Sequence, residues 1–436
     1  MVWVMMMPGL ASGGQRSAPR ARPAPRRGGA PTPSCLSSLQ PSLRFGVIYL
    51  DNNATTQPSR ACVEAMREVD ELAWFNPSSV HRAGQAARHR LELARRDIAE
   101  LIGARPREIT FTSGGTEAID LAIEGVLGAL PPTRRELVTT EIEHAAIRDL
   151  GEELAVLGRA KVLLVPPESD GVISPGALAN ALTPATGLIS VQWANNETGA
   201  IQPVREIAAL ARARGLLFHI DATQWVGKQP TNLRDTSDDP WCDLITFAPH
   251  KFHGPKGVGV LWTHPRVRLR PRVPGSQELG RRGGTENVPA IVGAAVAAQE
   301  ALAWLRLDAP RAQLAALRDE FEGAILNLLP WAQVNGPRDQ RRLWNTTNIA
   351  FPRLEAEALL LMLSERGLCA SAGAACSSGS LDPSPVLLAM GVPPQAAHGS
   401  LRFSLSRAST RDEVMQAATF VADAAGHLRQ SLPADG

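Results

Sequence analysis

The chain has 436 residues, of which 44% are hydrophobic and 20% charged, the balance of an ordinary globular protein. That length is too great for one small domain and suits a large α/β domain joined to a smaller one. The formal net charge of +2 creates no strong field for nucleic acid or an anionic membrane. No uninterrupted apolar run reaches the roughly 18 residues of a membrane span. From the small net charge and the lack of such a run, we expect neither nucleic acid nor membrane as a direct partner.

Residues 1–46 are rich in Pro, Arg, Gly, Ala and Ser and contain no Asp or Glu. Such a segment buries too little apolar surface to order itself, which predicts a disordered N-terminal extension. An organellar targeting peptide and a wrongly chosen start codon are the two explanations for it. The five cysteines are few, odd in number and irregularly spaced, which indicates free thiols in a reducing compartment and favours a cytoplasmic location.

From Val47 onward, apolar runs of strand length alternate with helical periodicity. We expect strands at 161–165, 188–193, 216–220, 244–247 and 258–262. We expect helices at 82–102, 116–130, 145–157 and 204–214. Several of the strands are continuously apolar, as in a sheet covered on both faces, and the strand–helix alternation predicts a mainly parallel sheet.

After about residue 290 the helical pattern predominates. We expect helices at 288–305, 311–329, 355–365 and 411–428, and strands at 347–351 and 400–405. This change of pattern predicts a second, smaller α+β domain.

The segment Phe111-Thr-Ser-Gly-Gly-Thr-Glu117 opens one of the predicted helices. The unpaired N–H groups and the dipole of a helix start can hold a phosphate, although an ordinary Gly-rich loop with an N-cap has the same appearance. Asp221 follows an apolar strand, where open α/β sheets place ligand groups. A carboxylate there can keep a ring nitrogen protonated, and the alternative is an N-cap for the next helix.

Only four lysines occur, at positions 161, 228, 251 and 256. Lys251 lies just past a buried strand in Ile245-Thr-Phe-Ala-Pro-His-Lys-Phe-His-Gly-Pro-Lys-Gly-Val-Gly259, where partial burial lowers the pKa of an amine and makes it a usable imine former. We interpret Lys161 and Lys228 as surface lysines, and Lys256 as part of a Gly-rich turn. His250 and His253 suggest zinc, but Gly254 and Pro255 break the helix and no further ligand follows, so no metal site is predicted.

Three further side chains are candidates for chemistry. His144 begins a predicted helix and could be held there by its neighbours, or could stack on a planar ring and transfer protons. Cys376 lies within a run of small residues, Ala370 to Ser380, which predicts a mobile loop with an accessible thiol. Arg402 could bind a substrate carboxylate through its fork, or could lie on an exposed strand face.

In this order, these segments resemble the class V aminotransferase-like cysteine desulfurases, specifically the NifS/IscS group, over roughly residues 47–430. The matching motifs are Tyr49-Leu-Asp-Asn-Asn-Ala-Thr-Thr56, Asn76-Pro-Ser-Ser79 with His81, Phe111–Glu117, Glu143-His144, Asn195-Asn-Glu-Thr-Gly199, Asp221-Ala-Thr-Gln224, His250-Lys251, Arg281–Thr285, the Cys376 loop and Arg402-Phe-Ser-Leu405.

The resemblance implies an α/β fold of the PLP-dependent transferase type, similar to aspartate aminotransferase. A large domain over 61–305 would contain a mainly parallel seven-stranded sheet. A smaller α+β domain over 306–436, with the Cys376 loop, would also include the N-terminal segment 47–60. The resemblance further implies a homodimer.

The implied cofactor is pyridoxal 5′-phosphate, which Lys251 would carry as a Schiff base while also moving the α-proton. At the ring, Asp221 would contact the pyridine nitrogen, Gln224 the ring hydroxyl, and His144 would stack on the ring. Asn196 would lie beside cofactor and substrate. The implied phosphate contacts are Gly115, Thr116 and His250, together with Thr285 at the phosphate of the neighbouring subunit. Asn196 and Arg402 would bind the substrate carboxylate, and Cys376 would be the nucleophile.

The implied reaction converts L-cysteine to L-alanine and leaves the sulfur on Cys376 as a persulfide. An acceptor protein, such as an iron–sulfur scaffold or a sulfur carrier for thiolated cofactors or tRNA, would then take it. The alternatives are a selenocysteine lyase or another class V aminotransferase, and a non-catalytic PLP-binding regulatory protein. Cys376 argues against transamination, and the nearly complete set of motif residues argues against a non-catalytic protein.

One residue departs from the family pattern. The family usually has a phosphate-binding Ser two residues before the His of the His-Lys pair, and this chain has Ala248 there. We expect one phosphate hydrogen bond to be missing, or to be replaced by Thr246 or water, with a larger effect on cofactor affinity than on the type of reaction.

Overall fold

The computed structural model describes residues 46–235, 237–373 and 382–431. The predicted extension, except for its last residue, lies outside the described residues, and so does Cys376.

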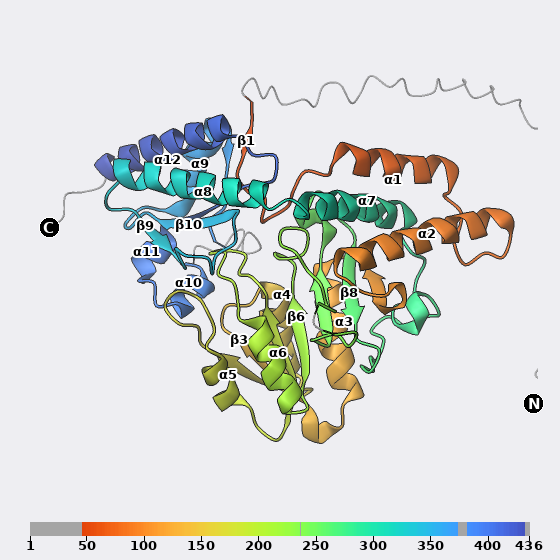
Figure 1. The fold of residues 1–436 in the computed structure, drawn as a ribbon. Helices are drawn as coiled ribbons and strands as arrows, with labels where there is room; N and C mark the ends of the chain where they lie inside the picture. Colours follow the sequence, from red (N-terminus) through yellow and green to blue (C-terminus); the bar gives the residue numbers. More distant parts are fainter. Residues whose placement is uncertain (1–45, 236, 374–381, 432–436) are drawn as a thin grey trace, which may run out of the picture. The chain divides into compact units, whose positions relative to one another are not determined.

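A seven-stranded sheet forms the centre of the larger part of the fold (Figure 1), in the order β2-β8-β7-β6-β5-β3-β4. Its strands are β2 (Ile109–Thr112), β3 (Glu136–Thr140), β4 (Lys161–Val165), β5 (Thr186–Gln192), β6 (Leu217–Asp221), β7 (Leu244–Phe247) and β8 (Gly259–Thr263). β8 is antiparallel to its two neighbours, and the other adjacent pairs are parallel. The predicted α/β fold with a mainly parallel seven-stranded sheet is therefore confirmed.

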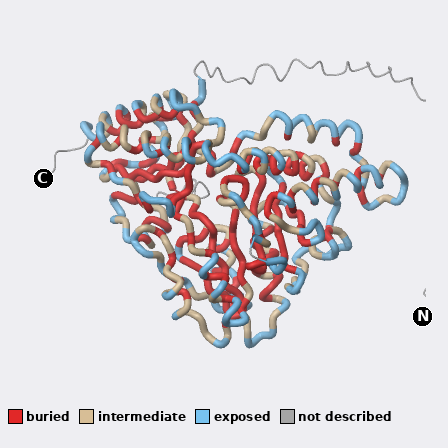
Figure 2. Tube along the Cα trace, viewed as in Figure 1, coloured by how far each residue is buried: buried red, intermediate tan, exposed pale blue. Residues whose placement is uncertain are grey.

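Helices cover both faces of this sheet, because neighbouring residues on a strand point to opposite sides. Leu137 and Leu188 join a core with α3 and α4, whereas Val138 and Ile189 join the core that includes α2, α6 and α7. The helices of this part are α1 (Arg60–Leu72), α2 (Arg82–Leu101), α3 (Gly115–Ala129), α4 (Ala145–Val156), α5 (Pro175–Ala181), α6 (Val204–Ala213) and α7 (Val288–Leu305). Figure 2 shows the buried residues concentrated along the central strands.

Helix α7 is the one described helix that is long and apolar enough to cross a membrane, with a mean hydropathy of 1.5. The search of the sequence for an uninterrupted apolar run did not find this helix, because Gln299 and Glu300 interrupt its apolar run. In the structure it packs against α1 and α2, and Ala294, Ala297 and Ala298 are completely buried. These contacts are those of a core helix.

A second hydrophobic core surrounds a three-stranded antiparallel sheet with the order β12-β10-β9. Its strands are β9 (Gln333–Asn335), β10 (Thr346–Ala350) and β12 (Ser400–Ser404), and the helices nearby are α8 (Ala309–Leu328), α9 (Ala356–Glu365), α10 (Pro385–Ala389), α11 (Pro394–His398) and α12 (Arg411–Ser431). The completely buried Phe321, Phe351 and Phe403 fill this core. The α+β pattern expected here is present.

The N-terminal segment is attached to this second core. Strand β1 (Ile48–Tyr49) pairs in parallel with β11 (Leu368–Cys369), and the Asn52 amide donates to the Ser404 carbonyl at 2.9 Å. The chain then continues into α1 on the larger part. The N-terminal segment thus contacts both parts of the fold, and the domain boundaries stay a prediction.

Candidate active site

A cavity of about 370 Å³ opens where β5, β6 and β7 end, beside the start of α3. Polar side chains gather here because the carboxyl ends of parallel strands meet at one edge of a sheet. Most of the predicted site residues line it, namely Gly115, Thr116, His144, Asn196, Asp221, Gln224, His250, Lys251 and Arg402. Thr285 is exposed and does not line it. Cys376 is outside the described residues.

Lys251 reaches this cavity from the short 3-10 turn η4 (Pro249–Lys251), which follows β7. Its Nζ donates to the carbonyl oxygens of Asn53 at 2.7 Å and Ala54 at 2.8 Å. The side chain is half-buried. The N-terminal segment thus holds the amine at the cavity wall.

Asp221 is the last residue of β6, and its buried carboxylate also lines the cavity. Oδ1 accepts a hydrogen bond from the Thr223 backbone N–H at 3.0 Å, which orients the carboxylate. Gln224 follows on the same turn, and its Nε2 donates to the Asn53 carbonyl at 3.0 Å. Asn53 O therefore accepts from both Gln224 and Lys251.

His144 is the N-cap of α4, and its Nδ1 accepts the Ala146 backbone N–H at 3.1 Å. A ring nitrogen that accepts carries no proton, so in the neutral ring the proton is on Nε2. The same ring lines the cavity. His144 therefore begins helix α4 and also lines the cavity, so the two interpretations are compatible.

The start of α3 forms one end of the cavity. Gly114 caps this helix without a side-chain hydrogen bond, which suits an anion at the N–H groups that follow. A Cβ atom on Gly115 would lie 3.5 Å from the Ala248 Cβ and 3.8 Å from the Thr223 Oγ1. Burial and the neighbouring lysines lower the pKa of His250, another cavity residue, to about 3, so its ring is neutral.

Thr246 was one of the two candidates to replace the missing serine hydroxyl, and the structure contradicts it. Its Oγ1 is 3.0 Å from Nε2 of His219 and is completely buried in the sheet. The hydroxyl at the cavity belongs to Thr223. The strand register directs the Thr246 side chain toward His219, which the sequence alone does not reveal.

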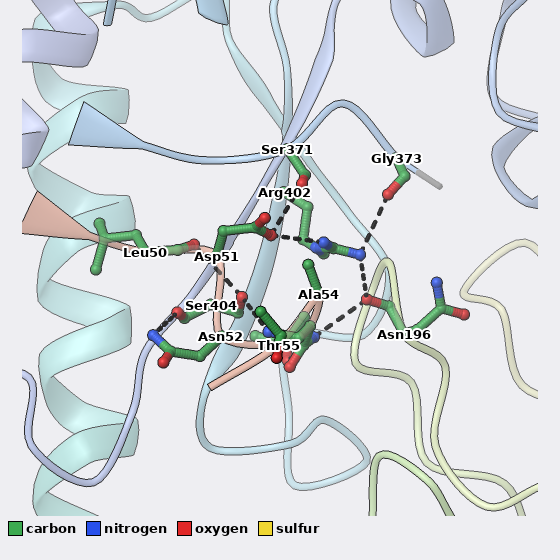
Figure 3. Close-up of polar contacts among 12 residues, drawn as sticks. Leu50, Asp51, Asn52, Ala54, Thr55, Asn196, Ser371, Gly373, Arg402 and Ser404 are labelled. Atoms are coloured by element: carbon green, nitrogen blue, oxygen red, sulfur yellow. Dashed lines mark hydrogen bonds and ion pairs between the residues drawn. The ribbon is translucent and has the colours of Figure 1, made fainter. Parts of the chain in front are cut away.

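Arg402, on β12, is 1% exposed, so the alternative of an exposed strand face is wrong. Its Nη2 donates to Asp51 Oδ1 at 2.7 Å, and its Nη1 donates to the carbonyls of Asn196 and Gly373 at 3.2 Å each (Figure 3). Ser371 Oγ donates to the same Asp51 oxygen at 2.9 Å. One arm of the fork is thus neutralised by Asp51, and the other, within residues 46–235, 237–373 and 382–431, meets two neutral carbonyls.

Four cavity residues and one neighbour were missed by sequence reasoning. Asn53, Glu143, Glu197 and Thr223 all lay within the matching motifs without an assigned task, although all four line the cavity and the first three are buried. Lys228, interpreted as a surface lysine, is only 3% exposed. Lys228 contacts Gln224, and the one sequence signal for this contact was the spacing of four residues between them.

This combination of groups fits pyridoxal phosphate. An amine, a strand-end carboxylate and an imidazole surround the cavity, and a helix start without a side-chain cap lies at one end. Amine, acid and phosphate site are the three groups that this cofactor requires of a protein. Among the described residues no cluster of three metal-binding side chains occurs.

Residues 48–416 match the aminotransferase class-V family, and the chain belongs to this family, whose members depend on pyridoxal phosphate. The fold is the α/β fold of PLP-dependent fold type I enzymes. The chain is 45% identical over 371 residues to cysteine desulfurase 2 of Trichormus variabilis, covering 85% of this chain and 91% of the relative.

Two solved structures are also similar. A NifS-like protein shares 34% identity with a TM-score of 0.80, covering 88% of this chain and all of that one. The protein SspA, solved in complex with cysteine, shares 31% identity with a TM-score of 0.71, covering 83% of this chain and 99% of that one.

Proposed function

We propose that this chain is a PLP-dependent cysteine desulfurase that converts L-cysteine to L-alanine and passes the sulfur to an acceptor. The observation that carries the proposal is the convergence of Lys251, Asp221 and Arg402 on one cavity. The similarity to a curated cysteine desulfurase over most of the chain supports the choice of substrate.

Different cavity residues would hold different groups of the cofactor. Lys251 would hold its aldehyde carbon, Asp221 its pyridine nitrogen, and the start of α3 its phosphate, with the neutral His250 and the Thr223 hydroxyl beside it. When bound, the cofactor supplies an electron sink for the bonds that break on the substrate.

The substrate carboxylate is the ligand that Arg402 fits. Its Nη1 donates to the carbonyls of Asn196 and Gly373, and a carboxylate is a stronger acceptor for a guanidinium than a carbonyl is. The Lys251 amine and the Nε2 of His144 both belong to cavity residues and would be the groups that move protons at the substrate carbons. The hydrogen bond of Nδ1 to the α4 backbone fixes that ring in place.

We assign the nucleophile to Cys376, which remains a sequence-based proposal. Its thiolate attacks the cysteine sulfur, so that the Cβ–S bond breaks, an S–S bond forms, and Cβ takes up a proton before alanine leaves. The described residues on either side support this assignment, because Gly373 O accepts from Arg402 and Ser384 Oγ donates to Glu197 at 2.6 Å. Both partners line the cavity.

Further parts of the proposal concern the assembly. Thr285 is exposed and lines no part of its own cavity, which supports a homodimer in which each Thr285 serves the cofactor phosphate of the other chain. The proposed acceptor is an iron–sulfur scaffold or a sulfur carrier. The proposed location is the cytoplasm.

The test uses the purified chain reconstituted with pyridoxal phosphate. We expect it to form alanine from L-cysteine without a keto acid, and to release sulfide when a reductant is present. Lys251→Ala should lose the cofactor absorbance, whereas Lys161→Ala, a change at an exposed lysine, should keep it.

The sulfur step has its own pair of variants. Cys376→Ala should keep the cofactor absorbance and lose desulfuration, and Cys369→Ala is the matched control, because burial and Asp51 raise the pKa of that thiol. Persulfide formation at the wild-type rate in Cys376→Ala would show that the nucleophile is wrong. A strict requirement for a keto acid would indicate transamination instead.

A further inference from the structure

Lys228 is a buried lysine next to the cavity. It follows the turn after β6, and its side chain is 3% exposed. Its Nζ donates to Gln224 Oε1 at 2.6 Å and to Asn53 Oδ1 at 2.8 Å. Its carbonyl accepts the Trp344 indole N–H at 2.9 Å, so the backbone is held as well. The amine therefore has a defined position beneath Gln224 and Asn53.

The charged groups that act on this lysine are cations. In the part of the chain that the structure describes, no carboxylate forms an ion pair with it, and the charged groups that act on it are the cations Lys251 and Arg402. Burial and these two cations lower the pKa of the Lys228 amine well below its usual value. A buried amine with like charges nearby does not favour folding, which points to a task at the site.

The amine determines which way the Gln224 amide faces. A side-chain amide has one accepting end and one donating end, which can exchange places by rotation. Because Lys228 uses N–H groups toward Gln224, it takes the accepting Oε1, and the donating Nε2 must lie on the other side. There Nε2 reaches the Asn53 carbonyl, the same oxygen that accepts from Lys251 Nζ.

We propose that Lys228 is a positioning residue that holds the Gln224 amide with its N–H toward the cofactor ring and holds Asn53 against Lys251. The inference rests on the proposed function, because it requires the cofactor in this cavity. An N–H aimed at the ring oxygen favours the deprotonated oxygen, so Lys228 tunes the bound cofactor without touching it.

The test compares Lys228→Met with wild type in the cofactor-bound protein. Methionine has a similar length and no donor, so Gln224 loses the contact that orients it. We expect the pH midpoint of the cofactor absorbance to rise by about one unit, and kcat to fall about tenfold with a smaller change in KM, the effect of one hydrogen bond. Lys161→Met, at an exposed lysine, should change neither.

A double-mutant cycle shows whether Lys228 acts through Gln224. In a Gln224→Ala background, Lys228→Met should produce no further shift of the absorbance midpoint. A shift that adds fully to that of Gln224→Ala would overturn the proposal, because Lys228 would then act as a charge by itself. An unchanged midpoint in the Lys228→Met single variant would overturn it as well.

A second variant keeps the test decisive if Lys228→Met does not fold. Gln224→Glu can pair with the Lys228 amine but presents no N–H to the ring, so its absorbance midpoint should rise in the same direction. A wild-type midpoint in Gln224→Glu would refute the orientation of the amide. If wild type itself shows no cofactor absorbance, the proposed function fails and not this inference alone.

Discussion

The Asp51 carboxylate and the Arg402 guanidinium are joined by a 2.7 Å hydrogen bond, although 351 positions separate them in the chain. Both are held by further partners, since Ser371 donates to Asp51 and two carbonyls accept from Arg402. The ion pair neutralises a buried guanidinium and leaves its second arm directed at weak acceptors. This arrangement is the basis of the first prediction.

Arg402→Lys should weaken the use of L-cysteine. An ammonium cannot bind Asp51 and a substrate carboxylate with the planar fork of an arginine, so kcat/KM should fall roughly 10- to 100-fold, mainly through KM. Steady-state kinetics with L-cysteine measure this effect, and Arg366→Lys, at the Asp423 surface pair, is the control. A wild-type KM in Arg402→Lys would place the carboxylate site elsewhere.

Ala248→Ser should strengthen cofactor binding. Ala248 lines the cavity at the end where α3 begins, and a serine there can add one hydrogen bond to a phosphate. We expect roughly a tenfold lower dissociation constant for pyridoxal phosphate, with kcat unchanged at saturation. Equilibrium dialysis of the cofactor measures the constant.

Two threonine variants test the same end of the cavity. Thr223→Val should weaken cofactor binding, because its hydroxyl lies there, whereas Thr246→Val should leave the affinity unchanged, because its hydroxyl contacts His219. Equal losses of affinity in both variants would contradict this assignment.

Substitution of His144 should separate helix capping from chemistry. His144→Ala removes both, and loss of an N-cap typically costs about 1 kcal/mol of unfolding free energy. His144→Asn restores a good N-cap, so it should recover most of that stability while both variants lose desulfuration. Chemical denaturation and alanine formation measure the two effects, and an active His144→Asn would remove the imidazole from the mechanism.

Glu143 should make stability depend on pH. Burial raises the pKa of its carboxyl from 4.5 to about 8, with a contribution from Asp221, although hydrogen bonds from Thr140 and Gln192 oppose the shift. Between those two values the folded chain keeps a proton that the unfolded chain releases. The contribution of Glu143 to stability is therefore full below about pH 4.5 and is lost as the pH rises toward 8.

Glu143→Gln imitates the protonated acid and should remove this dependence. Denaturation midpoints at pH 5 and pH 8 should differ less in the variant than in wild type, by the effect of about one proton. Glu141→Gln, at an exposed carboxyl nearby, serves as the control. Equal pH dependence in Glu143→Gln and wild type would mean that the acid is already ionised at pH 5.

Local pattern was sufficient for most of the fold. The apolar runs at β4 and β7 predict strands with the observed bounds, and the apolar run before Asp221 predicts its position at the carboxyl end of a strand. Strand β2, with only four residues, lies on the edge of the sheet and was not predicted. Its sequence, ITFT, alternates apolar residues with threonines and offers no continuous apolar run, whereas the equally short β7 is mainly apolar.

Contacts between distant residues were the part that could not be predicted. Lysine is normally exposed, and the Asn53 partner of Lys228 lies 175 positions away, so nothing local indicated burial. The fork of Arg402 likewise finds Asp51 only in the folded chain. Side-chain direction depended on register, as the contact of Thr246 with His219 illustrates.

The parallel pairing of β1 with β11 sets the order in which the molecule can be completed during synthesis. Residues 48–49 leave the ribosome long before residues 368–369, so β1 cannot pair with β11 until then. Asp51 likewise cannot bind Arg402 until residue 402 has emerged. All strands of the large sheet lie between 109 and 263, so that sheet can assemble while translation continues. The cofactor cavity, in contrast, gains the wall that contains Arg402 only after β12 has emerged, so we expect it to capture its cofactor later than the large sheet assembles.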